Sequence, residues 1–264
     1  MRDAAREETM TVTNISRHQS DYVLTMIKKA VPLVLVMSLL GAALSYAAYS
    51  DDLSVSAWPW RIGVLIAVLS CAALLFVYVR YRGTNDLCAY GLVMAIGTIS
   101  TYYFFGIFCY FCYFVFAPMP DVVRWPGLFG GIALNLVWAL VVQRNVHRIV
   151  NTTPFLDKVI KEHGETLVYD VQRGAAEFDR YHNEPNIMPT VFKYIVFGIA
   201  PFYLVMSRLL SSNFGTNGVL LFLAVFGMPV ALLFVSLFVR NYALMVVLPR
   251  KIAKERGRRV LVAE

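Results

Sequence analysis

Six long apolar blocks constrain this chain more than any other feature of its sequence. They run over residues 30–50, 62–79, 87–117, 126–142, 191–210 and 218–239, the last with a further apolar turn or two to 248. A helix needs roughly 20 mostly apolar residues to cross about 30 Å of hydrocarbon. Charged residues make up only 16% of the chain, against about a quarter in an average soluble domain. The sequence therefore predicts an all-α membrane protein, a polytopic bundle of about six transmembrane helices.

The distribution of Lys and Arg predicts the orientation of this bundle. Nearly all of them fall on the side that holds the N-terminus, the turn at 80–86, the segment 143–192 and the C-terminal tail, and only Arg61, Arg124 and Arg208 fall on the other. Basic residues concentrate in cytoplasmic loops. We therefore expect both termini in the cytoplasm, as an even number of spans requires, and a bacterial inner (plasma) membrane as the location.

The blocks divide the chain into five expected parts. These are an N-terminal cytoplasmic segment over 1–29, spans one to four over 30–142, a cytoplasmic loop segment over 143–190, spans five and six over 191–248, and a basic cytoplasmic tail over 249–264. The polar first 27 residues do not have the form of a cleavable signal peptide, and Met10 is a second candidate start.

The loop segment 143–190 carries weak secondary-structure patterns of its own. Thr153 and Pro154 precede an apolar pattern that predicts a short helix, 166–172 alternates like a short strand, and 175–181 predicts a second helix. About fifty residues bury too little apolar surface to form a stable domain alone. We therefore expect the segment to pack under the membrane bundle.

The apolar blocks are almost free of ionised groups. No Asp or Glu lies well inside a block, although an ionisable residue within a span is the usual mark of coupled ion transport. The His residues are scattered, and we find no metal-ligand spacing, phosphate loop or hydrolase motif. We therefore predict no catalytic residues, no metal and no cofactor, and we read the net charge of +7 as attraction to anionic lipid, with no nucleic acid as partner.

Basic and polar residues near the end of the sixth block are the candidates for lipid-headgroup contacts. They are Arg240, Asn241, Arg250 and Lys251. The alternative for Arg240 and Asn241 is that the sixth span simply ends there, with 241–248 lying along the membrane interface and Pro249 as a stop.

An aromatic run over 102–116 is the main candidate for an interaction surface. Large rings fill the space between helices, and their hydroxyls can bond to neighbours. The residues that we expect on such a surface are Tyr102, Tyr103, Phe108, Tyr110 and Tyr113. Cys109 and Cys112 lie within the run, but no charge flanks them to activate a thiol, so we expect inert cysteines.

Small residues spaced four apart predict close helix packing. Gly41 and Ser45 in the first block and Gly127 and Gly131 in the fourth fit this pattern. Asn135, one turn after Gly131, is the best candidate for a hydrogen bond between helices.

Three hypotheses for function follow. The first is a non-enzymatic inner-membrane protein that acts through protein–protein contacts within the bilayer, as an assembly subunit, exclusion factor or immunity-type factor, with another membrane protein or a second copy as partner. The second is a channel or carrier for a neutral or lipidic solute, its path lined by Ser100, Thr101 and Asn135. The third is a lipid-modifying enzyme, whose candidate residues are Arg144, His147, Arg240 and Asn241.

Overall fold

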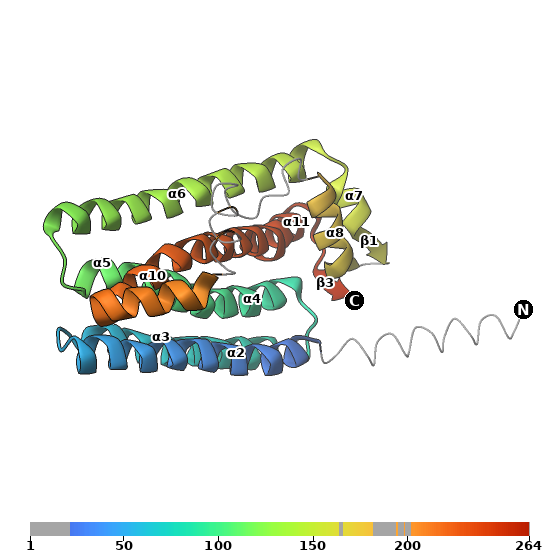
Figure 1. Cartoon of the computed structure of the whole chain (residues 1–264). Coiled ribbons are helices and arrows are strands. Elements are labelled where there is room, and N and C mark those ends of the chain that lie inside the picture. Colours follow the sequence, from blue (N-terminus) through green and yellow to red (C-terminus); the bar gives the residue numbers. More distant parts are fainter. Residues whose placement is uncertain (1–21, 164–165, 182–193, 195–197, 199–201, 264) are drawn as a thin grey trace, which may run out of the picture.

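Long helices lie side by side and a small sheet closes one end of them. The computed structural model describes residues 22–163, 166–181, 194, 198 and 202–263, and Figure 1 shows the helices running along one direction with the strands at one end. We call that end the sheet end, and the end that carries the connections 53–57 and 117–120 the loop end. The all-α membrane character predicted from composition is confirmed. Five helices among the described residues are long and apolar enough to cross a membrane.

The first, second and fourth helices extend beyond the apolar blocks that predict them, and the third coincides with its block. The helices are α2 (Tyr22–Ser45) with the π-helical η1 (Tyr46–Asp52); α3 (Trp58–Tyr81); α4 (Leu87–Tyr102) with the π-helical η2 (Tyr103–Phe111) and α5 (Cys112–Phe116); and α6 (Asp121–Thr152). Asp86 starts α4 as an N-cap, its carboxylate accepting a hydrogen bond of 2.9 Å from the Cys88 N–H. Pro118 and Pro120 follow α5, where helical hydrogen bonding stops.

The last long helix, α10 (Tyr203–Tyr242), folds back on itself. Gly215 has φ 57° and ψ −147°, and a Cβ placed on Gly218 would lie 2.6 Å from the Leu210 carbonyl oxygen. Eight residues of unbroken helix would hold these two positions about 12 Å apart. The turn lies at the loop end, where the Asn217 amide donates 3.2 Å to the Pro118 carbonyl.

The second arm of α10 therefore returns towards the sheet end as the predicted sixth span. The first half of the predicted fifth span, 191–201, lies outside the described residues except for 194 and 198, and the first arm of α10 contains its second half. The six-span arrangement stays a prediction.

The helix does not stop at Pro249, which corrects the sequence-based expectation, and the end of the sixth span near Arg240 stays a prediction. The helix continues through the π-helical η4 (Ala243–Val247) and α11 (Leu248–Arg256). A proline removes an N–H donor and crowds the carbonyl four residues back, and the widened turn of η4 lies at this point. Gly257, with φ 65°, ends α11 in the left-handed conformation.

The expected basic tail is part of a three-stranded sheet. β1 (Ile160–His163) pairs antiparallel with β2 (Thr166–Asp170), and β2 pairs parallel with β3 (Val260–Ala263). The central strand lies where the weak alternation predicts one, but its partner β3 comes from the tail. Loop segment and tail therefore form one unit, together with α7 (Phe155–Val159) and α8 (Val171–Tyr181).

Buried side chains form three clusters along the bundle. One joins the sheet to α4, α6, η4 and α11 around Phe155, Leu167 and Tyr169. A second lies at the loop end around Tyr103 and Phe108, and a third joins α2, α3 and α4. In contrast, α6 exposes most of its length to the surroundings, as a helix facing lipid does.

Candidate functional site

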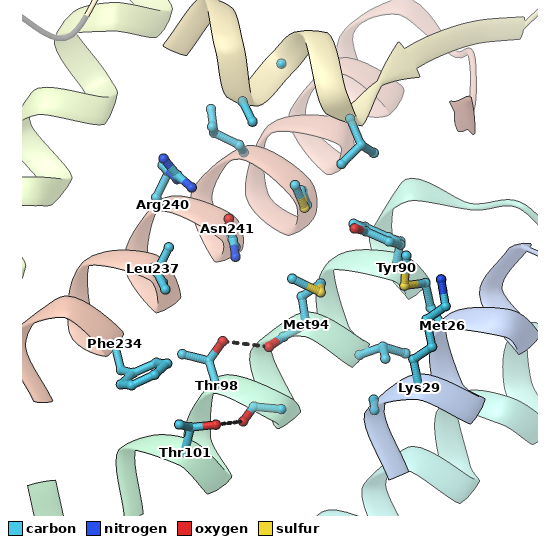
Figure 2. A pocket seen from close by; sticks show the side chains of 18 of the residues that line it. Met26, Lys29, Tyr90, Met94, Thr98, Thr101, Phe234, Leu237, Arg240 and Asn241 are labelled. Carbon is cyan, nitrogen blue, oxygen red and sulfur yellow. Dashed lines mark hydrogen bonds between the residues drawn. The ribbon is translucent and has the colours of Figure 1, made fainter. Parts of the chain in front are cut away.

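A cavity of about 400 Å³ opens between α2, α4, α8 and α10 near the sheet end (Figure 2). Pockets that bind small ligands in proteins commonly measure about 300–1,000 Å³. Its walls are mainly apolar and include Met26 and Leu33 of α2, Met94 of α4 and Phe234 and Leu237 of α10. The cavity is therefore large and apolar enough for part of a lipid-like molecule.

Two glycines of α4 explain why space remains at this place. A Cβ on Gly91 would lie 2.7 Å from the Met245 Cβ and 2.9 Å from the Met245 carbonyl carbon and oxygen, so α4 and η4 touch there. A Cβ on Gly97 would meet only a Leu33 methyl group, at 4.0 Å. Gly91 thus closes the helix pair towards the sheet, and Gly97 leaves the cavity open.

The Asn241 side chain points into the cavity without a hydrogen bond to any described residue. Asn241 is only 7% exposed. Its amide is not one of the fully buried polar groups that lack a partner, and it keeps hydrogen-bonding capacity that a molecule in the cavity can satisfy.

Arg240 lies at the rim of the cavity and contacts α8 twice. Its Nη1 donates to the Asp179 Oδ1 at 3.2 Å, and its guanidinium lies over the Phe178 ring at 5.4 Å from the centroid. Both side chains are partly exposed, at 20% for Arg240 and 65% for Asp179. An exposed ion pair contributes about 0–1 kcal/mol and an exposed cation–π contact about 0.5–1 kcal/mol, so this connection between α8 and α10 is weak.

The remaining polar groups give the cavity a positive character. Lys29 of α2 lines it, and among the described lining residues there is no Asp or Glu. The Thr98 and Thr101 hydroxyls are already used, because they donate to the Met94 and Gly97 carbonyls at 2.8 and 3.0 Å (Figure 2). The charged and amide groups therefore provide the unused hydrogen-bonding capacity.

The base of α8 is held firmly against the sheet. Phe178 is buried in the sheet-end cluster beside Phe155, with ring centroids 6.2 Å apart. Gly174 packs on the Tyr169 ring, leaving no room for a Cβ. Burial raises the pKa of the Tyr169 phenol, which keeps it neutral beneath α8.

Of the four candidates for headgroup contacts, the structure brings two to the cavity. Arg240 and Asn241 line it, whereas Arg250 is exposed on α11 and Lys251 pairs with Glu255 at 3.9 Å. The headgroup role of all four stays a prediction. Lys29 and Gly97 were not predicted as site residues, because nothing in their local pattern shows that a cavity opens beside them.

The residues expected to line a polar path do not meet in one cavity. Thr101 lines the cavity, but the Ser100 hydroxyl bonds to Ser70 at 3.2 Å and Asn135 bonds within the α4–α6 contact. The candidates of the enzyme hypothesis are also divided: Arg144 and His147 line a separate hollow along α6.

Three of the five residues expected on an aromatic interaction surface lie inside the bundle. Tyr103, Phe108 and Tyr113 are buried, and Tyr102 and Tyr110 are half-buried. Their role in docking stays a prediction, and a partner would meet mainly the last two. Cys109 and Cys112 are likewise buried.

The small-residue pair of the first span receives an aromatic ring. A Cβ on Gly41 would lie 2.6 Å from the Tyr103 Cε1, and the Ser45 hydroxyl donates to the Gly41 carbonyl at 2.6 Å. The gap that glycine leaves is therefore filled by a side chain from η2.

The small-residue pair of the fourth span, Gly127 and Gly131, is likewise covered by an aromatic side chain from η2. The Tyr110 hydroxyl donates to the Gly127 carbonyl at 2.8 Å, and the Tyr110 ring lies against Gly131. Asn135 donates to the Gly131 carbonyl at 2.8 Å and accepts from the Tyr102 hydroxyl at 3.2 Å. Asn135 thus links α6 to α4.

Comparison with family models, with curated proteins and with solved structures found no match for this chain.

Proposed function

We propose that this chain binds a lipidic solute in the cavity between α2, α4, α8 and α10, as a binding protein or carrier within the membrane. The observation that carries the proposal is the combination of apolar walls with an amide, Asn241, that faces the cavity and bonds to no described residue. An apolar wall accommodates an acyl chain, and a few convergent polar groups fix the orientation of a ligand.

The proposal is tested by filling the cavity. Gly97→Leu places an apolar side chain where a Cβ meets only Leu33 at 4.0 Å, and Gly130→Leu is the matched control, since a Cβ at Gly130 meets nothing within 4 Å. Gly130 lies on the exposed face of α6. Both variants gain the same helix propensity.

Native mass spectrometry of the detergent-purified full chain measures the lipid or fatty acid that stays bound. We expect loss of bound ligand in Gly97→Leu and retention in Gly130→Leu. Equal retention in both variants would refute ligand binding at this cavity.

The contact-based function stays a second proposal, in which α6 offers the exposed apolar length. Lipid covers such a face as well as a protein does, so the cavity is the more specific feature. Affinity purification in mild detergent tests the contact-based function, and recovery of the chain alone would count against it.

A further inference from the structure

We infer that the cavity selects amphiphiles whose head is an oxyanion, and that Asp179 of α8 occupies the position of this head on Arg240 in the unliganded protein. The inference rests on the proposed function and specifies the ligand class for the same cavity. The relevant head is a carboxylate or a phosphate, because both present several negatively charged oxygens to a cation.

The charges beside the cavity favour an anion. Arg240 and Lys29 line it without an acidic residue among the described lining positions. A guanidinium stays charged at every physiological pH and offers planar donors that match carboxylate and phosphate oxygens. A cationic head would meet two like charges here.

Asn241 completes the recognition of an oxyanion. The residue is 7% exposed, and its amide faces the cavity and bonds to no described residue. Beside the cationic Arg240, an NH2 donor can serve an anionic oxygen. Arg240 and Asn241 would therefore hold the head at the rim, with the tail against Met94 and Phe234.

The Asp179 carboxylate already makes the contact that the head would make. It lies 3.2 Å from Arg240 and is 65% exposed, so its carboxylate can return to water without leaving a buried charge. An arriving carboxylate or phosphate replaces one anion on Arg240 by another. This exchange would free Asp179 from Arg240, while Phe178 stays in the sheet-end cluster.

The experiment compares oleate with oleyl alcohol, which share a tail and differ in the charge of the head. Binding of each to the full chain in detergent is measured by equilibrium dialysis. We expect oleate to bind more tightly by about tenfold or more, because hydrogen bonds to charged groups contribute about 1.5–3 kcal/mol. Nanodiscs of phosphatidylglycerol and of phosphatidylcholine, analysed for retained lipid, then distinguish a phospholipid from a free fatty acid as the source.

Two variants change the anion site in opposite directions. Arg240→Gln should weaken oleate about tenfold and leave oleyl alcohol unchanged, with Arg82→Gln as a control of equal charge change in the α3–α4 turn. Asp179→Asn should strengthen oleate, by up to about fivefold, since it removes a competing exposed ion pair. A misfolded variant cannot bind more tightly, so this second result tests the inference even if Arg240→Gln folds poorly.

The outcomes separate the two proposals. If both ligands bind equally and neither variant changes oleate affinity, the cavity binds lipid but the selection of anions is wrong. If neither ligand binds and neither nanodisc lipid is retained, the proposed function fails and the inference fails with it.

Discussion

Gly227 of α10 is the position at which a single methyl group should disturb the bundle most clearly. An added Cβ would lie 2.6 Å from the Phe105 carbonyl oxygen and 2.7 Å from the Cys109 Cβ, both in η2. The nearest atom is backbone and cannot rotate away as a flexible side chain does. Gly227→Ala must therefore push α10 away from the π-helical segment.

The size of the effect follows from two opposing terms. Overpacking a well-packed interior costs about 1–3 kcal/mol, whereas replacing glycine by alanine within a helix stabilises by about 1 kcal/mol. Gly130→Ala is the control, because a Cβ there meets nothing within 4 Å and only the helix term acts. The two variants should thus differ by about 1–3 kcal/mol in the free energy of unfolding.

Thermal unfolding in one detergent measures this difference. About 2–4 °C of Tm accompanies each kcal/mol in a chain of about this size, so Gly227→Ala should unfold roughly 2–12 °C below Gly130→Ala. If both variants shift Tm equally, the close approach of α10 and η2 is wrong.

Three further predictions concern other contacts. Trp138→Phe removes the 2.7 Å hydrogen bond to Ser236 and should lower the free energy of unfolding by about 0.6 kcal/mol, the average for such bonds in membranes. A double variant that also carries Ser236→Ala should have the same Tm as Trp138→Phe alone. Val262→Asp places a carboxylate at a position in β3 that is only 2% exposed. Because a buried unpaired charge is costly, β3 should detach from the sheet in this variant. Limited trypsin digestion should then release the C-terminal segment of Val262→Asp and leave that of Val262→Ile intact. Because the pKa of Tyr169 is raised in the folded sheet, the fold favours the neutral phenol. The stability that this phenol contributes is intact below the ordinary tyrosine pKa of about 10 and is lost as the pH rises above it. Tyr169→Phe should therefore reduce the alkaline loss of structure measured by circular dichroism, and an unchanged pH profile would contradict this.

The membrane-spanning helices could be predicted closely because their cause is local. Crossing a bilayer requires a long apolar stretch with its backbone hydrogen bonds made internally, and each block carries that requirement in its own residues. The ends were less predictable. The prediction that Pro249 stops the helix failed, because a π-helical turn, which has no clear sequence pattern, precedes this proline and the helix continues to Arg256.

The candidate site was only partly predictable. Arg240 and Asn241 could be identified because polar residues are rare in an apolar block. Asp179, the partner of Arg240, lies 61 positions away in the chain. It belongs to a short amphipathic helix whose place beside α10 depends on the sheet. The cavity itself lies between four elements that are far apart in the chain, and the open space beside Gly97 is a property that no local pattern contains.

The sequence by itself determined that this is a helical membrane protein with nearly uncharged spans, since hydrophobic burial in lipid depends on composition and length alone. Only the tertiary structure decided that the C-terminal tail completes a sheet with the loop segment, that η2 rings fill the glycine faces of α2 and α6, and that a cavity opens beside Asn241. The physical reason is that strand pairing, ring packing and empty volume are properties of residues far apart in the chain. They exist only once the helices have taken their places.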